Sequence, residues 1–371
     1  MSHICNTPRT SPKNFNLHQI LPMRILLVHN SKIPINTYDD AERVLWWLGK
    51  ELVKMGHEVR FLVKKGSQCP FAEVLPLDEK KPLDEQIPPD TDLVHFHFEP
   101  KESISKPYLV TFHDNATEAK TFDSNTVFVS AKHAHLHGGS VYVHHGIDFE
   151  EYGTPELGNR RMYFHFLGNA AWSGKNVRGA IDIASKVGSR LHVIGGTRVN
   201  FRKGLRITLS PSVRFHGVLN PEGRNALLNS SKGLIFPVIW HEPFGLAVAE
   251  SLYFGCPVFG TPYGALPELL GKKIYTENRR KPHSDNGTIE AFYCDFGCLS
   301  VKKSELLEAV KNADSFDRVK CHEYAREHFS ATRMTQDYLA LYEKVLNGCA
   351  LHAEPPTLSE APGDKFLPFG E

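Results

Sequence analysis

The 371-residue sequence lacks the features that mark several classes of protein. Residues 1–22 are polar and contain no apolar core, so they resemble neither a secretory signal nor a membrane span. The net charge is only +1, which gives no electrostatic argument for binding nucleic acid. The seven cysteines are scattered, and Cys294 and Cys298 have no second pair at zinc-ligand spacing. We therefore expect free thiols in a reducing cytoplasm.

Strand-like apolar runs alternate with helical stretches in two successive halves of the chain. This alternation predicts an α/β fold of two doubly wound, Rossmann-like domains, whose strands end at one interdomain cleft. We expect a disordered N-terminal extension over 1–22, a first domain over 23–150, a linker over 151–160, a second domain over 161–332, a C-terminal helix over 333–349 and a disordered tail over 350–371.

Individual elements follow from apolar periodicity and from glycine and proline signals. In the first half we predict strands at 24–29, 57–63, 92–98, 108–113 and 126–130, a helix at 41–56 and a last strand within 141–161. In the second half we predict strands at 161–168, 190–196, 213–219, 233–239 and 256–260, and helices at 176–188, 221–230, 302–313 and 333–347.

The most informative stretch is "WHEPFGLAVAES" (240–251), in which Glu242 and Glu250 flank a run of small residues. Pro243 suits a first helical position, and the preceding apolar run predicts a strand–loop–helix unit. The helix N-terminus then lies where the strands end, and its free N–H groups favour an anion. Two acids beside it suggest a ligand with phosphates and hydroxyls, such as a nucleotide sugar. The spacing alone is equally consistent with a surface helix carrying two solvated glutamates.

Four further motifs accompany "EPFGLAVAE" (242–250): "GHEV" (56–59), "VHHGID" (143–148), "FLGNAAWSGKNVRGAI" (166–181) and "GCPVFGTPYGALPELL" (255–270). Together they resemble the retaining glycosyltransferases of family 4, also described as glycosyl transferases group 1, which have the GT-B fold. The resemblance covers roughly residues 23–347. It implies an enzyme with an acceptor-side first domain and a second domain that binds a nucleotide-sugar donor.

The resemblance also implies roles for residues of the second domain. Glu242 would contact hydroxyls of the donor sugar and help to stabilise charge at the reacting centre. Glu250 would accept hydrogen bonds from the ribose hydroxyls. Lys175 would balance the charge of the departing diphosphate. The distal phosphate would be held by the backbone N–H groups of Phe244, Gly245 and Leu246.

Other implied contacts come from strand ends. Gly195 and Gly196 would let the backbone approach the nucleotide, and the strand end at His216 and Gly217 would meet the base. His113, in "TFHD", matches a first-domain histidine that contacts the donor sugar in this family. Without the resemblance, His113 is equally consistent with a buried, hydrogen-bonded strand histidine.

The first departure from the family pattern concerns the glycine turn Gly168–Asn169, which we place in the donor site. The family commonly has an arginine just after this glycine, and here Asn169 stands in its place. Arg178 or a basic residue of 197–206 could substitute for that arginine. Alternatively, the basic residues form a solvated loop.

The second departure lies before the first helix, where Asp39 and Asp40 occupy positions at which many members carry two glycines. Two carboxylates near a diphosphate would repel it and weaken or abolish activity. They could instead contact a cationic acceptor or cap the helix, and we favour the caps.

Three further signals have ordinary explanations. "DTD" (90–92) mimics an Asp-x-Asp metal motif, but two prolines precede it and a predicted strand follows, so we interpret it as a turn. His133 and His137 share a helical face without a third ligand, which disfavours a metal site. Trp47 could contact a membrane surface or a glycan, and we favour packing against a neighbouring loop.

These observations favour a retaining, metal-independent glycosyltransferase without a cofactor, located in the cytoplasm or at the inner face of the membrane. Its partners would be a nucleotide-sugar donor and a glycan, lipid-linked or small-molecule acceptor, with peripheral membrane contact as an option and no nucleic acid. The alternatives are a nucleotide-sugar epimerase or hydrolase on the same fold, and a sugar-nucleotide-binding protein without turnover.

Overall fold

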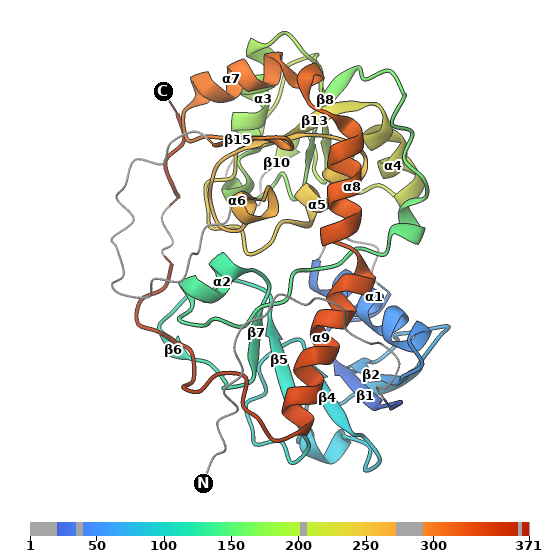
Figure 1. Ribbon diagram of the computed structural model, residues 1–371. Helices are drawn as coiled ribbons and strands as arrows, with labels where there is room; N and C mark the ends of the chain where they lie inside the picture. The colour runs from blue at the N-terminus through green and yellow to red at the C-terminus, as the bar shows by residue number, and fades with distance from the viewer. Residues whose placement is uncertain (1–20, 35–39, 201–205, 272–291, 363–365, 371) are drawn as a thin grey trace.

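The computed structural model describes residues 21–34, 40–200, 206–271, 292–362 and 366–370. Figure 1 shows two α/β domains, each built on a largely parallel sheet, with the second domain drawn above the first. The predicted α/β class is confirmed. The N-terminal extension predicted to be disordered lies almost wholly outside the described residues, which begin at Leu21.

The first domain contains a six-stranded parallel sheet in the order β3-β2-β1-β4-β5-β7. Its central strands, β1 and β4, are short and largely apolar with little exposed surface, as is usual for a parallel sheet covered on both faces. The strands are β1 (Arg24–Val28), β2 (Glu58–Lys64), β3 (Glu73–Leu77), β4 (Leu93–Phe96), β5 (Tyr108–Phe112) and β7 (Thr126–Phe128). The strand order reverses between β1 and β4, where ligands of such sheets commonly bind.

The second domain contains a seven-stranded sheet in the order β12-β9-β8-β13-β14-β16-β15. All neighbours are parallel except β15, which pairs antiparallel with β16. The strands are β8 (Tyr163–Leu167), β9 (Leu191–Ile194), β12 (Val213–Phe215), β13 (Ser231–Phe236), β14 (Val258–Gly260), β15 (Phe292–Cys294) and β16 (Gly297–Leu299). Here the order reverses between β8 and β13, so their carboxyl ends mark the second half of a binding cleft.

Most helices lie where the periodic apolar residues predicted them, and α2, α6 and α8 are additional helices that were not predicted. Gly56, at φ +90°, follows the first helix and ends it as predicted. The helices are α1 (Asp40–Lys54), α2 (Ala131–Leu136), α3 (Val177–Lys186), α4 (Pro221–Asn229), α5 (Leu246–Tyr253), α6 (Leu266–Leu269), α7 (Lys303–Lys311), α8 (Arg318–His328) and α9 (Ala331–Leu346).

The chain returns to the first domain after α8. Figure 1 shows α8 against the second domain and α9 along the first, and α9 contacts both α1 and β5. The Ser330 hydroxyl caps α9 by accepting from the backbone N–H of Arg333. The crossing fixes one domain relative to the other at the side of the cleft.

The segment after α9 corrects the prediction of a disordered tail. Strand β17 (Thr357–Leu358) pairs antiparallel with β6 (Lys120–Thr121) of the first domain. The Leu367 N–H then donates to the carbonyl of Ile239 in the second domain, 2.8 Å away. Buried apolar side chains such as Leu358 stabilise this path, a contribution that the proline-rich composition concealed.

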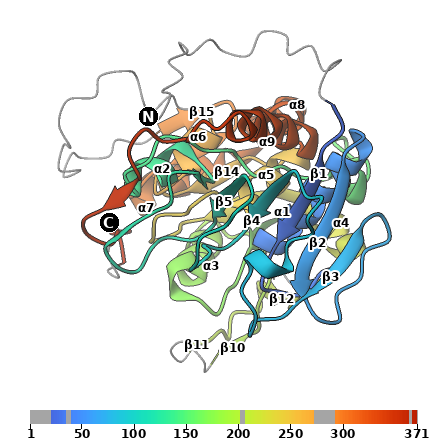
Figure 2. The ribbon, with the colours of Figure 1, turned by 90° about the horizontal axis from the view of Figure 1, so that it is seen from below.

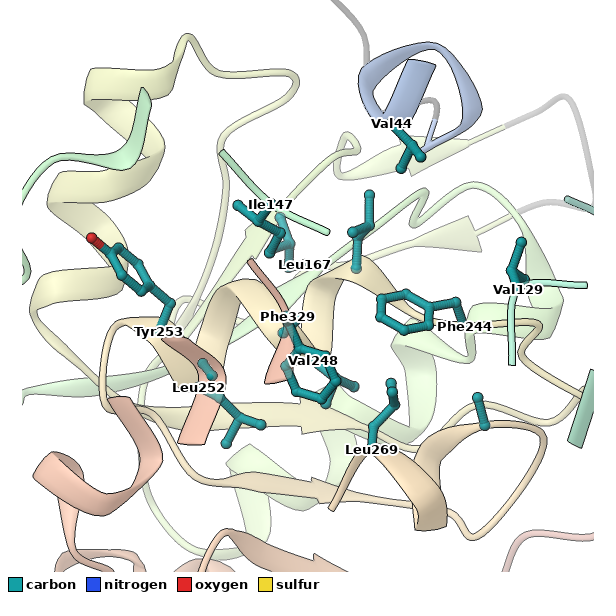
Figure 3. Packing of buried hydrophobic residues seen from close by; sticks show 14 of the residues in the cluster. Val44, Val129, Ile147, Leu167, Phe244, Val248, Leu252, Tyr253, Leu269 and Phe329 are labelled. Carbon is teal, nitrogen blue, oxygen red and sulfur yellow. The ribbon is translucent and has the colours of Figure 1, made fainter. Parts of the chain in front are cut away.

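Apolar packing continues from one domain into the other. Figure 3 shows Val44 of α1 and Ile147 of the interdomain segment near Leu167 and Phe244 of the second domain. All four belong to one buried cluster. The two domains therefore share a hydrophobic contact.

A short hairpin, β10 (Val199–Asn200) with β11 (Arg206–Ile207), projects from the body of the molecule in Figure 2. It carries part of the basic segment 197–206, of which 201–205 lie outside the described residues. Among the helices that the structure describes, none combines the length and the apolar character needed to cross a bilayer.

Candidate active site

A cleft of about 1020 Å³ lies between the two domains and is lined by residues of both. Ten of the predicted site residues line it: His113, Gly168, Asn169, Lys175, Gly195, Glu242, Phe244, Gly245, Leu246 and Glu250. Three others, Gly196, His216 and Gly217, are not among the lining residues. The carboxyl ends of both sheets, at the points where their strand orders reverse, therefore face the same cleft.

The N-terminus of α5 forms part of the cleft wall. The helix begins at Leu246 and not at Pro243, so the predicted proline start is wrong. Gly245 precedes it in a left-handed conformation (φ +96°), and no side chain caps the first turn. The first N–H groups of a helix have no intrahelical acceptor, which leaves this end suited to an anion.

Glu242 lies beside this helix start and is only 3% exposed. Both of its carboxylate oxygens accept hydrogen bonds from the Lys175 ammonium group, at 2.8 and 2.7 Å. The indole N–H of Trp240 donates to the same carboxylate at 2.9 Å. Charge-assisted bonds of this kind offset the cost of burying the ion pair.

Aromatic rings surround the other side of the lysine. Its Nζ lies 5.2 Å from the ring centre of Trp240, 5.3 Å from that of Phe236 and 5.9 Å from that of Trp172. These cation–π contacts hold the ammonium group in place at the cleft. Trp172 and Trp240 also line the cleft, and neither was predicted from the sequence as a site residue.

Gly264, in the predicted glycine loop, fixes the backbone of Glu242. It has φ +63°, and a Cβ at this position would lie 2.1 Å from the Glu242 carbonyl oxygen. The next residue, Ala265, donates its N–H to that oxygen at 2.9 Å. Only glycine fits here, so the loop at 255–270 acts by positioning the acid.

Glu250 is 1% exposed and is held by side chains from three other parts of the chain. Arg43 of α1 and Tyr152 of the interdomain segment both donate to its Oε1. Arg224 of α4 donates to the same atom at 3.4 Å. Burial raises the pKa of Glu250, but the charges of Arg43 and Arg224 outweigh it and lower the pKa overall.

The glycine turns are packed against one another. A Cβ on Gly195 would lie 2.3 Å from the Gly168 carbonyl oxygen, and one on Gly196 would lie 2.5 Å from the Ala170 side chain. The Asn169 side chain accepts from the N–H of Ala171 at 3.1 Å, which shapes the turn. These glycines permit close approach between two loops, in addition to any approach to a ligand.

The predicted base-binding strand end lies beside the cleft. The His216 ring bonds to His192 at 3.1 Å and stacks on it, and Gly217 donates its N–H to the carbonyl of Gly196. Val218, the residue after Gly217, lines the cleft, whereas His216 and Gly217 do not.

His113 occupies the centre of a set of histidines in the first domain. Its Nε2 bonds to His97 Nδ1 at 2.9 Å, and its Nδ1 bonds to His145 Nε2 at 3.2 Å. Burial lowers the pKa of His113 and His97 well below the usual value and that of His145 to about 3, and neighbouring imidazoles add to the effect. Of these three histidines, only His113 was predicted from the sequence as a site residue.

The structure agrees with two further interpretations of the sequence, those of Trp47 and of the "DTD" motif. Trp47 is 3% exposed and donates its indole N–H to Glu151 at 2.8 Å, so packing against the neighbouring segment is confirmed and membrane contact by this residue is excluded. The acids of "DTD" form ion pairs: Asp90 with Arg60 and Asp92 with Arg24. Asp90 lies in a turn before β4, which agrees with the interpretation of this motif as a turn.

Four remaining predictions concern metal ligands, Arg178, the aspartate pair and the cysteines. Among the residues that the structure describes, there is no group of three or more His, Cys, Asp and Glu side chains that could hold a metal. Arg178 is exposed and does not line the cleft. Asp39 lies outside the described residues, as does the side chain of Asp40. Six cysteines are present in the described ranges, and all six are free thiols, as expected.

Comparison with known proteins supports the class of protein that the motifs suggested. Residues 161–285 match the family described as "Glycosyl transferases group 1". This segment contains the glycine turn, Lys175, Glu242 and Glu250. Among curated proteins, no sequence matches the chain significantly.

Three solved structures illustrate the proteins that have the same fold. AviGT4, a glycosyltransferase involved in avilamycin A biosynthesis, is 18% identical with a TM-score of 0.66, over 88% of this chain and 99% of that one. Sucrose-phosphate synthase from Thermosynechococcus elongatus is 12% identical with a TM-score of 0.63, over 88% and 100%. HepE of Anabaena, in complex with UDP and glucose, is 14% identical with a TM-score of 0.56, over 87% and 100%.

At these identities the likeness shows the fold, which is GT-B. The family match over the second domain supports a transferase enzyme of the group 1 glycosyltransferase type. Assignment to family 4 and the retaining stereochemistry stay predictions.

Proposed function

We propose that the protein is a retaining glycosyltransferase that moves a sugar from a nucleoside diphosphate to an acceptor hydroxyl. The observation that carries this proposal is the uncapped N-terminus of α5, which lies in the cleft between Glu242 and Glu250. A helix start attracts phosphate, and carboxylates accept hydrogen bonds from hydroxyls. A nucleotide sugar presents both groups in one molecule.

In the proposed donor site, the start of α5 and the charged residues beside it bind different parts of the nucleotide sugar. The N–H groups of Gly245 and Leu246 hold the distal phosphate, and Lys175 balances charge as the diphosphate departs. Glu242 faces the sugar and Glu250 faces the ribose. HepE of Anabaena, which has the same fold, has been solved in complex with UDP and glucose and with UDP-glucose. This supports a nucleotide ligand for the cleft.

The acceptor would enter from the first domain and attack from the face that the diphosphate leaves, with the leaving phosphate taking its proton. No further group is required to balance this step, because the proton lost by the acceptor is gained by the phosphate. We also propose that the reaction proceeds without a metal ion, with the Lys175 ammonium group as the cation that balances the charge of the diphosphate.

The test is incubation with a panel of nucleotide sugars, with and without a panel of glycan and lipid-linked acceptors, while release of nucleoside diphosphate is measured. We expect release that depends on an acceptor, a product whose anomeric proton signal matches the configuration of the donor, and full activity in EDTA. Glu242→Gln should abolish turnover. The matched control Glu308→Gln changes an exposed acid outside the cleft and should leave turnover intact.

Each other outcome contradicts part of the proposal. Acceptor-independent product would indicate an epimerase or hydrolase, and saturable binding without turnover would indicate a binding protein. An inverted anomeric signal would refute retention. Loss of activity in EDTA that Mn²⁺ restores would refute the metal-independent reaction.

A further inference from the structure

The C-terminal segment 366–370 contacts two loops of the second domain that lead to the proposed site. The Leu367 N–H donates to the carbonyl of Ile239 at 2.8 Å. The Tyr263 hydroxyl donates to the carbonyl of Pro368 at 2.6 Å. The segment does not line the cleft, and it lies beyond the part of the chain that the family resemblance covers. The resemblance therefore assigns it no role.

The contact at Ile239 bears on both members of the ion pair between Lys175 and Glu242. Ile239 lies three residues before Glu242, and its own N–H donates to the carbonyl of Gly174 at 2.9 Å. Gly174 directly precedes Lys175. Hydrogen bonds thus join the backbone of Leu367 to that of Ile239, and the backbone of Ile239 to the loop that carries the lysine.

The contact at Tyr263 reaches Glu242 through a second loop. Tyr263 is 6% exposed and directly precedes Gly264, whose left-handed conformation lets the chain pack against the backbone of Glu242. The Ala265 N–H then donates to the Glu242 carbonyl at 2.9 Å. Residues 366–370 therefore hold both of the backbone stretches that determine where Glu242 lies.

Side chains of the segment fix it in this position. Leu367 and Phe369 pack against the main buried cluster, whereas Phe366 is 54% exposed. Gly179 of α3 leaves room for the ring of Phe369, because a Cβ there would lie 2.9 Å from its Cε1 atom. The Lys303 ammonium group lies 5.9 Å from the centre of the same ring. Apolar and cation–π contacts therefore support the backbone hydrogen bonds.

The preceding part of the tail is fixed to the first domain. Strand β17 pairs with β6, and Leu358 of β17 is buried. The His352 N–H donates to the Ser124 carbonyl at 2.9 Å, and its Nε2 bonds to the Thr126 carbonyl at 2.8 Å. Figure 1 shows the tail passing β6 and the C-terminus lying beside α7 of the second domain. Because the tail is anchored in this way, docking of 366–370 is an intramolecular step with a high effective concentration.

We propose that residues 367–370 are a positioning element for the transfer reaction, which holds Ile239 and Tyr263 and thereby fixes the geometry of the Lys175–Glu242 pair. This assignment rests on the proposed function for the nature of the reaction. A displacement of about 1 Å near a reacting centre can lower turnover about 100-fold. Since the segment does not reach the cleft, its loss should lower kcat and leave nucleotide affinity unchanged.

The first test compares kcat with the affinity for UDP, or for the diphosphate of another base if that binds more tightly. Leu367→Pro removes the N–H that bonds to Ile239, and Phe369→Ala removes the docked ring. Each should lower kcat about tenfold and leave the calorimetric affinity for UDP unchanged. Tyr263→Phe removes only the hydroxyl that bonds to Pro368 and should lower kcat about threefold.

Phe366→Ala is the matched control for Phe369→Ala, because the Phe366 ring is exposed in the same segment. It should leave both kcat and UDP affinity unchanged. An unchanged kcat in both Leu367→Pro and Phe369→Ala would overturn the proposal. Parallel losses of kcat and UDP affinity would also overturn it, because they would indicate a general disturbance of the second domain.

The second test needs no turnover and uses NMR of protein labelled with ¹⁵N-tryptophan. The Trp240 indole N–H donates to Glu242 at 2.9 Å, so its signal reports the place of the carboxylate. Leu367→Pro and Phe369→Ala should both shift this signal. They should leave the signal of Trp46 unchanged, since that ring packs on Phe71 in the first domain. An unchanged Trp240 signal in both variants would overturn the proposal.

Failure of the proposed function has a separate signature, which is wild-type protein that forms product without an acceptor or binds nucleotide without turnover. The Trp240 signal then still decides whether residues 367–370 position the pair.

Discussion

Glu250 illustrates how one side chain serves both the fold and the site. Its carboxylate accepts from Arg43, Tyr152 and Arg224, which lie on α1, on the interdomain segment and on α4. A ribose that binds here would share the acid with these partners. The acid therefore couples nucleotide binding to the contact between domains.

We predict that Glu250→Gln weakens binding of a nucleoside diphosphate about tenfold and removes the preference for ribose over 2′-deoxyribose, because a charge-assisted acceptor is lost. The same change should lower the free energy of unfolding by about 3 kcal/mol, because two buried arginines lose their counter-charge. Calorimetry with a nucleoside diphosphate and its 2′-deoxy counterpart measures the first effect. A variant that keeps the ribose preference would show that Glu250 acts only in the fold.

The ion pair between Lys175 and Glu242 leads to a prediction about turnover and stability. Lys175→Met should lower kcat about 100-fold and change donor affinity much less, because negative charge on the diphosphate grows toward the transition state. It should also lower the Tm, since Glu242 is 3% exposed and loses its cation.

Adding Glu242→Gln to Lys175→Met should restore the Tm but not the turnover, which separates the two effects. Lys186→Met is the control, because its ion pair with Asp182 is on the surface. A raised KM with unchanged kcat in Lys175→Met would mean that the lysine binds ground and transition states equally.

At the scale of elements, the start of α5 depends on the left-handed Gly245. We predict that Gly245→Ala lowers affinity for nucleoside diphosphates, because its Cβ would lie 3.2 Å from Glu242 Cγ and the backbone would shift away from φ +96°. Gly188→Ala is a matched control, since Gly188 has φ +67° with nothing within 4 Å of a Cβ.

Both variants should lose about 1 kcal/mol of stability from backbone strain, and only Gly245→Ala should lose ligand affinity. Calorimetry and thermal unfolding measure the two quantities. Equal affinity for nucleoside diphosphates in the two variants would show that the start of α5 does not bind the phosphate.

Element by element, the sequence predicted most of what builds the site, because apolar periodicity and glycine signals are local. It also contained a signal that we did not use. His29, His97 and His113 each directly follow β1, β4 and β5, which are neighbours in the sheet. Adjacent parallel strands end at one edge, so the gathering of these histidines could have been predicted.

Contacts between domains could not be predicted, because they depend on tertiary geometry. Nothing near Arg43 or Arg224 in the sequence indicates that both reach Glu250. The tail was missed for a related reason. Its composition suggested disorder, but partners from both domains supply the hydrogen bonds and apolar contacts that order it.

At the scale of the whole molecule, buried neutral histidines predict sensitivity to acid. Burial lowers the pKa of both His145 and His165 to about 3, below the unfolded value near 6.5. Between these values the unfolded chain binds protons that the folded chain does not, so stability falls as the pH falls below 6.5. Each such group should cost the fold about 2 kcal/mol by pH 5.

Thermal unfolding between pH 7.5 and pH 5 measures this effect. We expect the Tm to fall steadily, and His165→Asn to reduce the slope because one titrating group is removed. A Tm that stays constant down to pH 5 would contradict the neutral, buried state of these histidines.

The central claim is that the cleft binds a nucleoside diphosphate with its distal phosphate at the start of α5. A crystal structure of the complex with the nucleoside diphosphate that binds most tightly tests it most directly. The account predicts the distal phosphate within hydrogen-bond distance of the Gly245 and Leu246 N–H groups and near Lys175, and the ribose on Glu250. A diphosphate bound elsewhere, or in the cleft with its base at the helix start, would contradict the account.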